Sequence, residues 1–357
     1  MIRRRQLTVT PFTSRRVSIY LLPILLVNFG LSDASPLFDD DSVIEVTLTG
    51  PLKSLIDAKA EGTEWPFVLR AEGRDYQIKV RARGNSRLEL CRFPLLRLNF
   101  RGDDAFDSVF DGQDKLKLVT HCRSHDLAQV NTLEEYAAYR IFEVISNFSY
   151  KTRLLRVTYS DSEGRLKDGD YSRYAFLIES EEELERRIDG KQQHLEGVAT
   201  SSLNQQQAAL VFVFHYVIGN TDWSLVMAEG ATSCCHNGHL YSVADEIILV
   251  PNDFDFSGLV NTRYAKPPPS LRISRVTQRR YRGYCISTEK LNNALTSIRA
   301  MQEPILAVFD EIPGLSAKEI KRKKKYLKGF FDQVQNQPKM LESFEARCIG
   351  KAYEGHG

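Results

Sequence analysis

The chain has almost no net charge, because 48 Lys and Arg residues face 46 Asp and Glu residues in 357 positions, which leaves a formal charge of +2 at pH 7. It contains no internal repeat and no low-complexity segment. Nucleic-acid binding requires a concentrated basic surface, so this composition argues against nucleic acid as the main partner. The one basic run, 321–325, lies in a stretch of helical composition and is expected to be a solvated helix face.

The apolar run near the N-terminus, 17–31, is short for a membrane-spanning helix. Five arginines precede it and Ser32-Asp33-Ala34 follows it, which is the layout of a secretory signal. We predict a signal peptide over 1–34 and an exported protein, periplasmic, secreted or at the cell surface, which meets a membrane only through this segment if it stays uncleaved. Cleavage removes five arginines and one aspartate and changes the formal charge from +2 to −2.

The six cysteines all follow the predicted cleavage point. An even number in an exported chain permits disulfides but does not fix which cysteines pair. The adjacent Cys234 and Cys235 lie in an apparent insertion, and we expect them to fasten this loop to another part of the molecule, with Cys122 as one candidate partner. The histidines near these cysteines lack a spacing typical of zinc sites, so disulfides are favoured over a bound zinc ion.

The N-terminal half has the pattern of a mainly antiparallel sheet with one helix packed on it. Apolar and β-branched runs alternate with turn residues and predict strands over 43–48, 67–70, 76–83, 94–100, 115–119, 154–159 and 174–178. A capping box at 131–134 precedes residues with helical spacing up to Ile145, which predicts an amphipathic helix. We place a lobe boundary near Glu179, which gives a β-rich lobe, 35–179, and a helical lobe, 180–357.

The C-terminal half contains a strongly apolar segment, 203–219, which predicts a helix buried on most sides that stops at Gly219-Asn220. Two short strands are expected at 238–243 and 247–250. From about 288 onward the composition is helical. These elements place the pair of short strands between two polar loops, and both loops carry acidic residues.

Two carboxylates flank the short strands. Asp222 lies in the loop directly after the apolar helix, and Asp253 follows the second strand, with Asp255 two positions later. A hairpin between the two acids turns the chain back, so both side chains can reach one cleft. Phosphoryl transfer needs hard oxygen ligands that hold Mg²⁺ on the triphosphate, and a carboxylate that accepts the proton of the attacking hydroxyl. Protein kinases present these groups in the same order along the chain.

This order makes Asp222 the candidate catalytic base and Asp253 the candidate metal ligand. Asn237, just ahead of the first short strand, is a candidate for a second, neutral oxygen ligand. In an extended strand, Asp253 and Asp255 project to the same side, so Asp255 is either a further metal ligand or a turn cap.

The residues around these acids resemble the signature motifs of the CotH family of atypical protein kinases. The segments 218–223 (Ile-Gly-Asn-Thr-Asp-Trp), 236–237 (His-Asn) and 250–258 (Val-Pro-Asn-Asp-Phe-Asp-Phe-Ser-Gly) are similar to that family's asparagine-aspartate, histidine-asparagine and tryptophan-aspartate-x-aspartate series. The segment 80–87 (Val-Arg-Ala-Arg-Gly-Asn-Ser-Arg) is similar to its arginine-glycine-asparagine-serine segment. The resemblance spans about 78–258, and its specificity rests on the order of these short pieces.

The resemblance implies an α+β, two-lobed protein-kinase-like fold, in which an N-terminal antiparallel sheet lobe carries one packed helix and the C-terminal lobe is mainly helical. It implies ATP and Mg²⁺ or Mn²⁺ as cofactors, and protein Ser or Thr hydroxyls as acceptors. By position in the motifs, Asp222 is the proton acceptor, Asp253 the metal ligand and Asn237 the auxiliary ligand.

The nucleotide phosphates also require a cation from the sheet lobe, held by a carboxylate on the packed helix. Arg97 is the candidate cation, Lys115 and Lys117 are its substitutes, and Glu135 is the candidate helix partner. The family usually presents lysine where this chain has Leu95-Leu96 followed by Arg97. Arginine is a forked and always charged donor, whereas lysine is a compact point charge.

Three elements of ordinary kinases are absent from the sequence: the glycine-rich phosphate loop, the histidine-arginine-aspartate triplet and the aspartate-phenylalanine-glycine triplet. Arg83 and Asn85, in Arg83-Gly84-Asn85-Ser86, form either a backbone nest for phosphate or a plain turn. The sequence leaves both alternatives open.

The leading hypothesis is an exported CotH-like kinase that transfers the γ-phosphoryl group of ATP to protein Ser or Thr. The alternative is a catalytically inactive, kinase-like binding module of the cell envelope, and the irregular cation site motivates it. A third hypothesis is a metal-dependent phosphohydrolase that uses the aspartates on another fold.

Overall fold

The computed structural model describes residues 36–101, 104–123, 126–227 and 233–350. The predicted signal peptide, 1–34, lies outside these ranges and stays a prediction. Among the helices within them, none combines the length and the apolar composition needed to cross a bilayer.

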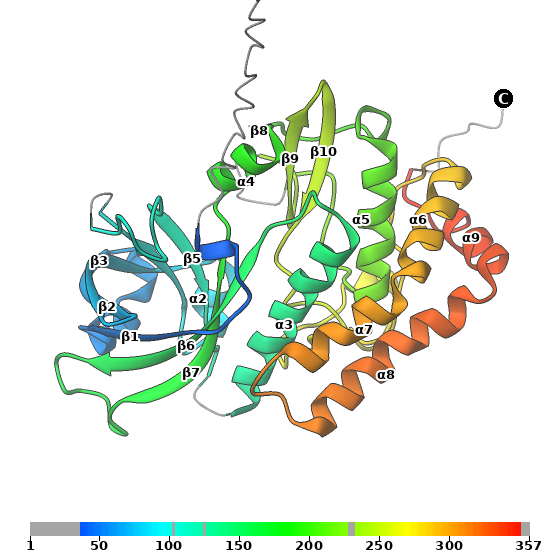
Figure 1. The fold of residues 1–357 in the computed structure, drawn as a ribbon. Helices are drawn as coiled ribbons and strands as arrows, with labels where there is room; N and C mark the ends of the chain where they lie inside the picture. Colours follow the sequence, from blue (N-terminus) through cyan, green and yellow to red (C-terminus); the bar gives the residue numbers. More distant parts are fainter. Residues whose placement is uncertain (1–35, 102–103, 124–125, 228–232, 351–357) are drawn as a thin grey trace, which may run out of the picture. The chain divides into compact units, whose positions relative to one another are not determined.

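Seven strands of the N-terminal half close into a barrel, in the spatial order β1-β2-β3-β4-β5-β7-β6 (Figure 1). Their bounds are β1 Ile44–Gly50, β2 Trp65–Ala71, β3 Arg74–Arg83, β4 Leu95–Asn99, β5 Lys115–Val119, β6 Thr152–Asp161 and β7 Tyr171–Ile178. Neighbouring strands pair antiparallel, except that β1 runs parallel to β6. Closure leaves no strand edge of this sheet unpaired.

The predicted fold class, a two-lobed protein-kinase-like fold whose N-terminal lobe is an antiparallel sheet with one packed helix, is therefore wrong, because the sheet is a closed barrel of mixed strand direction. β1 pairs with β2 on one side and with β6 on the other, and the second, parallel pairing closes the sheet. The positions predicted for the individual strands are confirmed to within a few residues. A strand alternates buried and exposed residues in an open sheet and in a barrel alike, so the sequence pattern does not reveal closure.

The barrel walls separate two apolar cores. Leu48, Val80 and Leu96 are fully buried in the core inside the barrel. Phe176 and Ile178 of β7 belong to a second core, which they share with helix α3, Asp126–Ile145. The predicted helix is thus confirmed, but the predicted capping box is wrong, because α3 begins five residues earlier than Asn131 and places that residue inside the helix.

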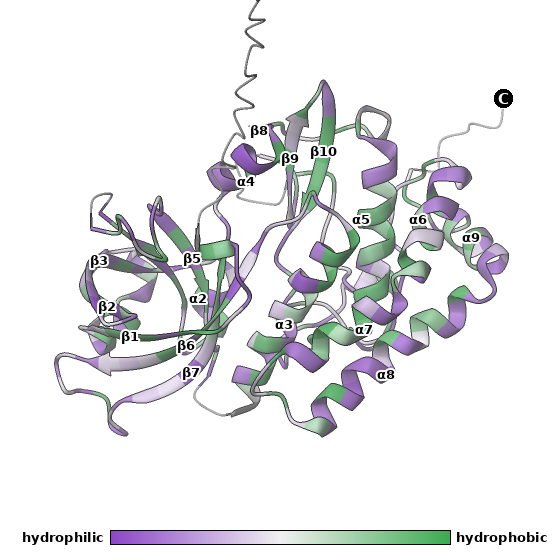
Figure 2. Cartoon of the chain, viewed as in Figure 1, coloured by the Kyte–Doolittle hydropathy of each residue, from purple (hydrophilic) through white to green (hydrophobic). Residues whose placement is uncertain are grey.

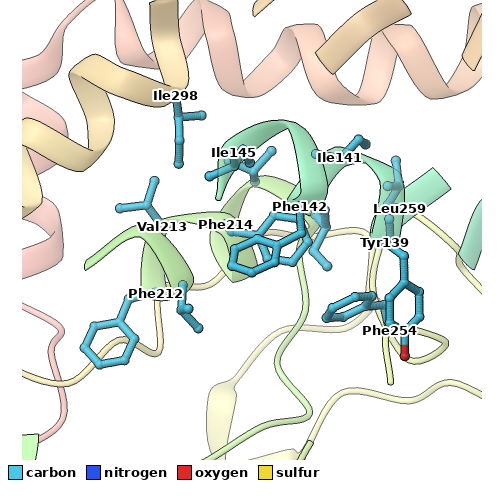
Figure 3. Packing of buried hydrophobic residues seen from close by; sticks show 14 of the residues in the cluster. Tyr139, Ile141, Phe142, Ile145, Phe212, Val213, Phe214, Phe254, Leu259 and Ile298 are labelled. Carbon is cyan, nitrogen blue, oxygen red and sulfur yellow. The ribbon is translucent and has the colours of Figure 1, made fainter. Parts of the chain in front are cut away.

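Helix α5, Gln205–Ile218, is the central element of the C-terminal half. It contacts α3, helix α6 (Thr288–Ala300), helix α8 (Ala317–Val334) and strand β10 (Glu246–Pro251), which explains why it is apolar on most sides (Figure 2). Phe142 of α3 packs against Phe214 of α5 with ring centroids 4.6 Å apart (Figure 3). The predicted buried helix is confirmed.

The remaining helices and strands are short or lie on the outside of the two halves, and α1 contacts β3 and β6 of the barrel. The bounds are α1 Leu52–Asp57, α2 Ser86–Leu90, α4 Glu181–Ile188, β8 Lys191–Gln193, β9 Gly238–Val243, α7 Gln302–Glu311 and α9 Gln337–Glu345. β9 and β10 form the predicted hairpin, and β8 extends it to a small sheet in the order β10-β9-β8. The basic run lies on α8 and is exposed at Lys321, Arg322 and Lys325, but Lys323 is buried with its Nζ 2.7 Å from Glu134 Oε1.

Three disulfides join Cys91 to Cys122, Cys234 to Cys235 and Cys285 to Cys348. The prediction of disulfides is confirmed, and they are compatible with an exported protein. The expectation that the Cys234-Cys235 pair fastens its loop elsewhere is wrong, because the two residues bond to each other and Cys122 bonds to Cys91.

The buried imidazole of His121 is expected to make the barrel sensitive to acid. Its ring stacks on Phe93 with centroids 4.3 Å apart, and burial together with the nearby Arg173 lowers its pKa from 6.5 to about 3. The unfolded chain binds a proton near pH 6.5 and the folded chain does not. Stability is therefore complete above pH 6.5 and falls as the pH drops from 6.5 toward 3, by up to about 1.4 kcal/mol per pH unit.

Urea unfolding at about pH 7 and about pH 4.5 measures this loss of stability. A His121→Phe variant is expected to lose less stability between the two pH values than the unaltered protein. Equal losses in both proteins would show that His121 does not carry the acid sensitivity.

Candidate functional site

The loop that carries Asp222 follows directly on α5. Gly219 ends the helix in a left-handed conformation (φ 65°) that residues with a side chain rarely adopt. The buried side chain of Asn220 then accepts a hydrogen bond from the backbone N–H of Asp222 (2.9 Å). On the other side, Trp223 stacks on His215 with ring centroids 4.5 Å apart. These contacts fix the backbone around Asp222, while its side chain stays 36% exposed and accessible to a ligand.

His236 and Asn237 orient the carboxylate of Asp222. His236 Nε2 lies 3.0 Å from Asp222 Oδ1, and Asn237 Nδ2 donates to Asp222 Oδ2 (3.1 Å) and to the Asp222 backbone carbonyl (2.6 Å). Within the described parts of the chain, Asn237 Oδ1 accepts no hydrogen bond. The structure thus places two of the predicted site residues in direct contact. His236 had no predicted role, and its position in the 236–237 (His-Asn) motif was the one available signal.

The β9-β10 hairpin returns the chain to this cluster. The backbone N–H of Asn252 donates to the backbone carbonyl of Asn237 (3.1 Å), and the N–H of Asp253 donates to the hydroxyl of Tyr139 (2.9 Å). Asn237 and Asp253 both have left-handed backbone conformations, with φ of 55° and 54°. Such conformations carry an energetic cost for residues other than glycine and cluster at functional sites.

Phe254 anchors the segment between the two acids in the core. It is fully buried, and its ring centroid lies 4.6 Å from that of Tyr139 and 5.3 Å from that of Phe214 (Figure 3). The expectation that Asp253 and Asp255 lie in an extended strand is wrong, because β10 ends before them. The two carboxyl groups are still close enough to interact, and the surrounding protein together with the negative charge of Asp255 raises the pKa of Asp253 above its usual range.

A buried arginine that the sequence analysis missed, Arg87 of α2, connects the acids to the barrel. Its Nε donates to Asp255 Oδ2 (2.7 Å), its Nη2 donates to Glu135 Oε2 (2.6 Å), and Asp253 Oδ1 lies 3.6 Å from Nη2. Tyr264 also donates to Asp255 Oδ2 (2.7 Å). Asp255 is therefore occupied by two donors, and Glu135, the predicted partner of Arg97, is the partner of Arg87. The only available signal was the position of Arg87 in the 80–87 motif.

A cavity of about 140 Å³ lies between the barrel and this cluster. Four of the predicted site residues line it: Arg83, Lys117, Glu135 and Asp253. The other lining residues are Leu95, Val119, Tyr139, Tyr150, Ile178, His239 and Asn252. The cavity is thus cationic on the barrel side and acidic on the opposite side.

Cations lie directly opposite one another on the outer face of β3, β4 and β5. Arg81 pairs in register with Arg97, and Arg97 pairs with Lys117. Lys117 is bonded to Glu181, but Arg81 and Arg97 have no carboxylate within 4.0 Å in the described residues, and Arg97 Nε is buried without a hydrogen bond. We call Arg81, Arg97 and Lys117 the cationic row. Like charges directly opposite each other destabilise a sheet, so this row favours an anionic ligand.

Two predicted residues, Asn85 and Lys115, lie away from the cavity, and Arg97 and Asp255 are not among its lining residues either. Asn85 is exposed just before α2 and makes no side-chain capping bond. Lys115 is exposed and lies 3.3 Å from Asp114. Asp222 and Asn237 are also absent from the lining, but the bond between Asn237 and Asn252 connects them to it.

No group of three or more His, Cys, Asp or Glu side chains in the described residues is arranged to hold a metal ion. Asp253 and Asn237 offer hard oxygen atoms, whereas Asp255 is bonded to Arg87 and Tyr264. Magnesium sites of nucleotide-dependent enzymes often use only one or two carboxylates and complete the coordination with substrate phosphates. The donor set fits a metal that arrives with a phosphate ligand.

Comparison with family models gave no match, and neither did comparison with curated proteins. The resemblance to the CotH family therefore rests on the short motifs alone.

Proposed function

We propose that the chain is an exported phosphotransferase of the CotH type, which binds ATP with Mg²⁺ or Mn²⁺ and transfers the γ-phosphoryl group to Ser or Thr hydroxyls of a protein. One observation carries the proposal: Arg83 and Lys117 of the barrel line one cavity together with Asp253, and the bond between Asn237 and Asn252 connects that cavity to Asp222. Phosphoryl transfer needs these groups together, because it depends on positioning and on charge stabilisation.

The barrel side of the site would hold the phosphates. Arg97 is forked and has a buried Nε without a partner, so a phosphate oxygen would satisfy it. Arg83 and Lys117 are close to each other and to the cavity, and burial lowers the pKa of both groups. An anion in the cavity relieves this burial cost by pairing with the charged forms.

The opposite side would hold the metal and the acceptor hydroxyl. Asp253 and Asn237 supply oxygen atoms for Mg²⁺ or Mn²⁺, which neutralises charge on the phosphates when bound. Asp222, oriented by His236 and Asn237, accepts the proton of the attacking hydroxyl. The cavity of about 140 Å³ is smaller than the roughly 300–1,000 Å³ of most ligand sites, so we expect it to widen when ATP enters.

Purified mature protein with labelled ATP and Mg²⁺ or Mn²⁺ is expected to incorporate label into a protein acceptor, and the same ligands are expected to raise the melting temperature, since a ligand selective for the folded state stabilises it. An Asp253→Ala variant is expected to lose both effects. A matched control, Asp245→Ala in the β9-β10 turn, is expected to keep both. Label retained by Asp253→Ala would remove the assigned metal site.

A second candidate function is a binding module of the cell envelope without turnover. The contacts of Arg87 favour this second function. Arg87 occupies the buried Asp255, so Asp253 is the one residue of the Asp253-Phe254-Asp255 segment whose carboxylate is half exposed. Absence of incorporation with any divalent metal, in a protein that still folds, would favour this function over the kinase.

A further inference from the structure

A disulfide joins two adjacent residues, Cys234 and Cys235, directly before the residues that contact Asp222. We call these residues, His236 and Asn237, the 236–237 turn. Two hydrogen bonds close the turn, since Cys235 N–H donates to the carbonyl of Gly238 (3.0 Å) and Gly238 N–H donates to the carbonyl of Cys235 (3.3 Å). Cys235 is therefore the first anchor of the turn.

The disulfide connects this anchor to a fixed part of the molecule. Cys234 is 2% exposed and belongs to the core of the C-terminal half, and its N–H donates to the carbonyl of Leu195 (2.5 Å). Cys235 is half-buried and packs against the same core. The covalent bond removes rotational freedom from the link between the core and the turn.

The turn contacts both halves of the candidate site. Its side chains contact Asp222, and its backbone carbonyl at Asn237 accepts from Asn252, next to Asp253. The backbone of His236 also pairs with Ser224 and Val226, just after Asp222. A displacement of the turn therefore alters the contacts of Asp222 and the position of the ligand oxygen of Asn237 at once.

The three disulfides differ in what they constrain. Cys91–Cys122 and Cys285–Cys348 join residues 31 and 63 positions apart and close loops in the unfolded chain. Loop closure is the main source of the stability that a disulfide contributes. Cys234–Cys235 joins residues one position apart, so it closes no such loop and its effect is local.

We propose that the Cys234–Cys235 disulfide is a positioning element of the candidate site, which holds the 236–237 turn against Asp222, and that its reduction releases the turn. The effect on turnover rests on the proposed function, whereas the contact between the turn and Asp222 does not. In the reduction, one thiolate of a dithiol reductant attacks the half-buried Cys235 sulfur, the S–S bond breaks and Cys234 leaves as a thiolate. The second thiol of the reductant then releases Cys235. Both cysteines end as thiols, and the reductant ends as a disulfide.

The test follows the imidazole signal of His236 by NMR in histidine-labelled full-length protein, with assignment from a His236→Gln variant. Dithiothreitol is added stepwise, and alkylation with mass spectrometry reports which cysteines have become thiols. We expect the His236 signal to shift in step with thiols at Cys234 and Cys235. A signal that stays in place when these two residues are thiols, or that follows another cysteine pair, overturns the proposal.

Matched variants separate the local effect from general loosening. Cys234→Ala/Cys235→Ala is expected to show the shifted signal without reductant, and Cys285→Ala/Cys348→Ala is expected to keep the signal of the oxidised protein. In an Asp222→Asn background, reduction is expected to move the signal much less, because the contact with the carboxylate is already altered. If the Cys234→Ala/Cys235→Ala variant does not fold, the stepwise reduction of the unaltered protein with dithiothreitol still tests the proposal.

The same samples test the consequence for activity. Loss of a group that orients a site residue typically lowers activity about 10–100-fold, so we expect Cys234→Ala/Cys235→Ala to lower kcat by about 10-fold. Cys285→Ala/Cys348→Ala should leave kcat unchanged under conditions where it is folded. If the unaltered protein transfers no phosphoryl group, the proposed function fails, and the His236 signal remains the independent test of the positioning element.

Discussion

Replacement of Arg87 by alanine is expected to lower the free energy of unfolding by about 3–5 kcal/mol, the usual cost of removing one partner of a buried ion cluster. The Arg87 side chain is 7% exposed and contacts Glu135 and Asp255, whose side chains are 5% and 3% exposed. Without the guanidinium, both carboxyl groups remain buried with no cation in contact. Urea unfolding at neutral pH measures the loss.

Conservative variants separate charge from packing at this position. Arg87→Lys keeps a charge but loses the fork that reaches two carboxylates, so an intermediate loss of stability is expected. Arg87→Ala combined with Glu135→Gln is expected to be more stable than the sum of the two single losses, because the double variant buries one uncompensated carboxylate fewer. Arg70→Ala, at an exposed ion pair with Asp75, should barely change the melting temperature. A similarly small change for Arg87→Ala would contradict the role given to the cluster.

The local elements could be predicted from the sequence, whereas the closure of the sheet could not. Strands β3, β4 and β5, helix α5 and the β9-β10 hairpin depend on patterns within a few residues, and the structure places each where the pattern indicates. Closure depends on the parallel pairing of β1 with β6, which is a contact between segments far apart in the chain. No local period encodes such a contact.

The residues of the candidate site also divide into those that local sequence patterns predict and those that depend on contacts between distant segments. Asp222 and Asp253 stand out because each follows a predictable element, a buried helix or a strand pair. Arg87 lies on a helix of five residues, and its role follows only from three carboxylates that come from α3 and from the segment after β10. The correct pairing of the cysteines was equally inaccessible, because an even count permits many pairings and adjacent cysteines are easily read as two separate bonds.

The contacts of Arg87 also determine how charge is distributed in the candidate site. Arg87 contacts both Glu135 and Asp255 but carries one positive charge, so it compensates one of the two carboxylates and leaves negative charge beside Asp253 that a metal would compensate. The cationic row on the barrel, by contrast, keeps two arginines without carboxylate partners in the described chain. The site as a whole therefore has a surplus of positive charge on one side only, which suits a ligand that brings both phosphates and a divalent cation.

Replacement of Asp222 by asparagine is expected to lower kcat for phosphoryl transfer by about 10²–10⁴-fold, the usual contribution of a positioned general base. Asparagine has nearly the same shape, and its side chain can still contact His236 and Asn237, so the fold should be retained. The Asp222 side chain is 36% exposed, and a surface substitution of this kind changes stability little. Phosphate incorporation per unit time, at saturating ATP and metal, measures the effect.

The decisive comparison is between Asp222→Asn and Asp253→Ala. Asp222 accepts a proton only during the reaction, so Asp222→Asn should keep the rise in melting temperature that ATP and metal produce, whereas Asp253→Ala should lose it. His236→Gln, which can still donate a hydrogen bond to Asp222, should lower kcat less than Asp222→Asn. If Asp222→Asn retains the full rate, another group accepts the proton; if it loses nucleotide binding as well, Asp222 is a ligand of the bound complex rather than its base.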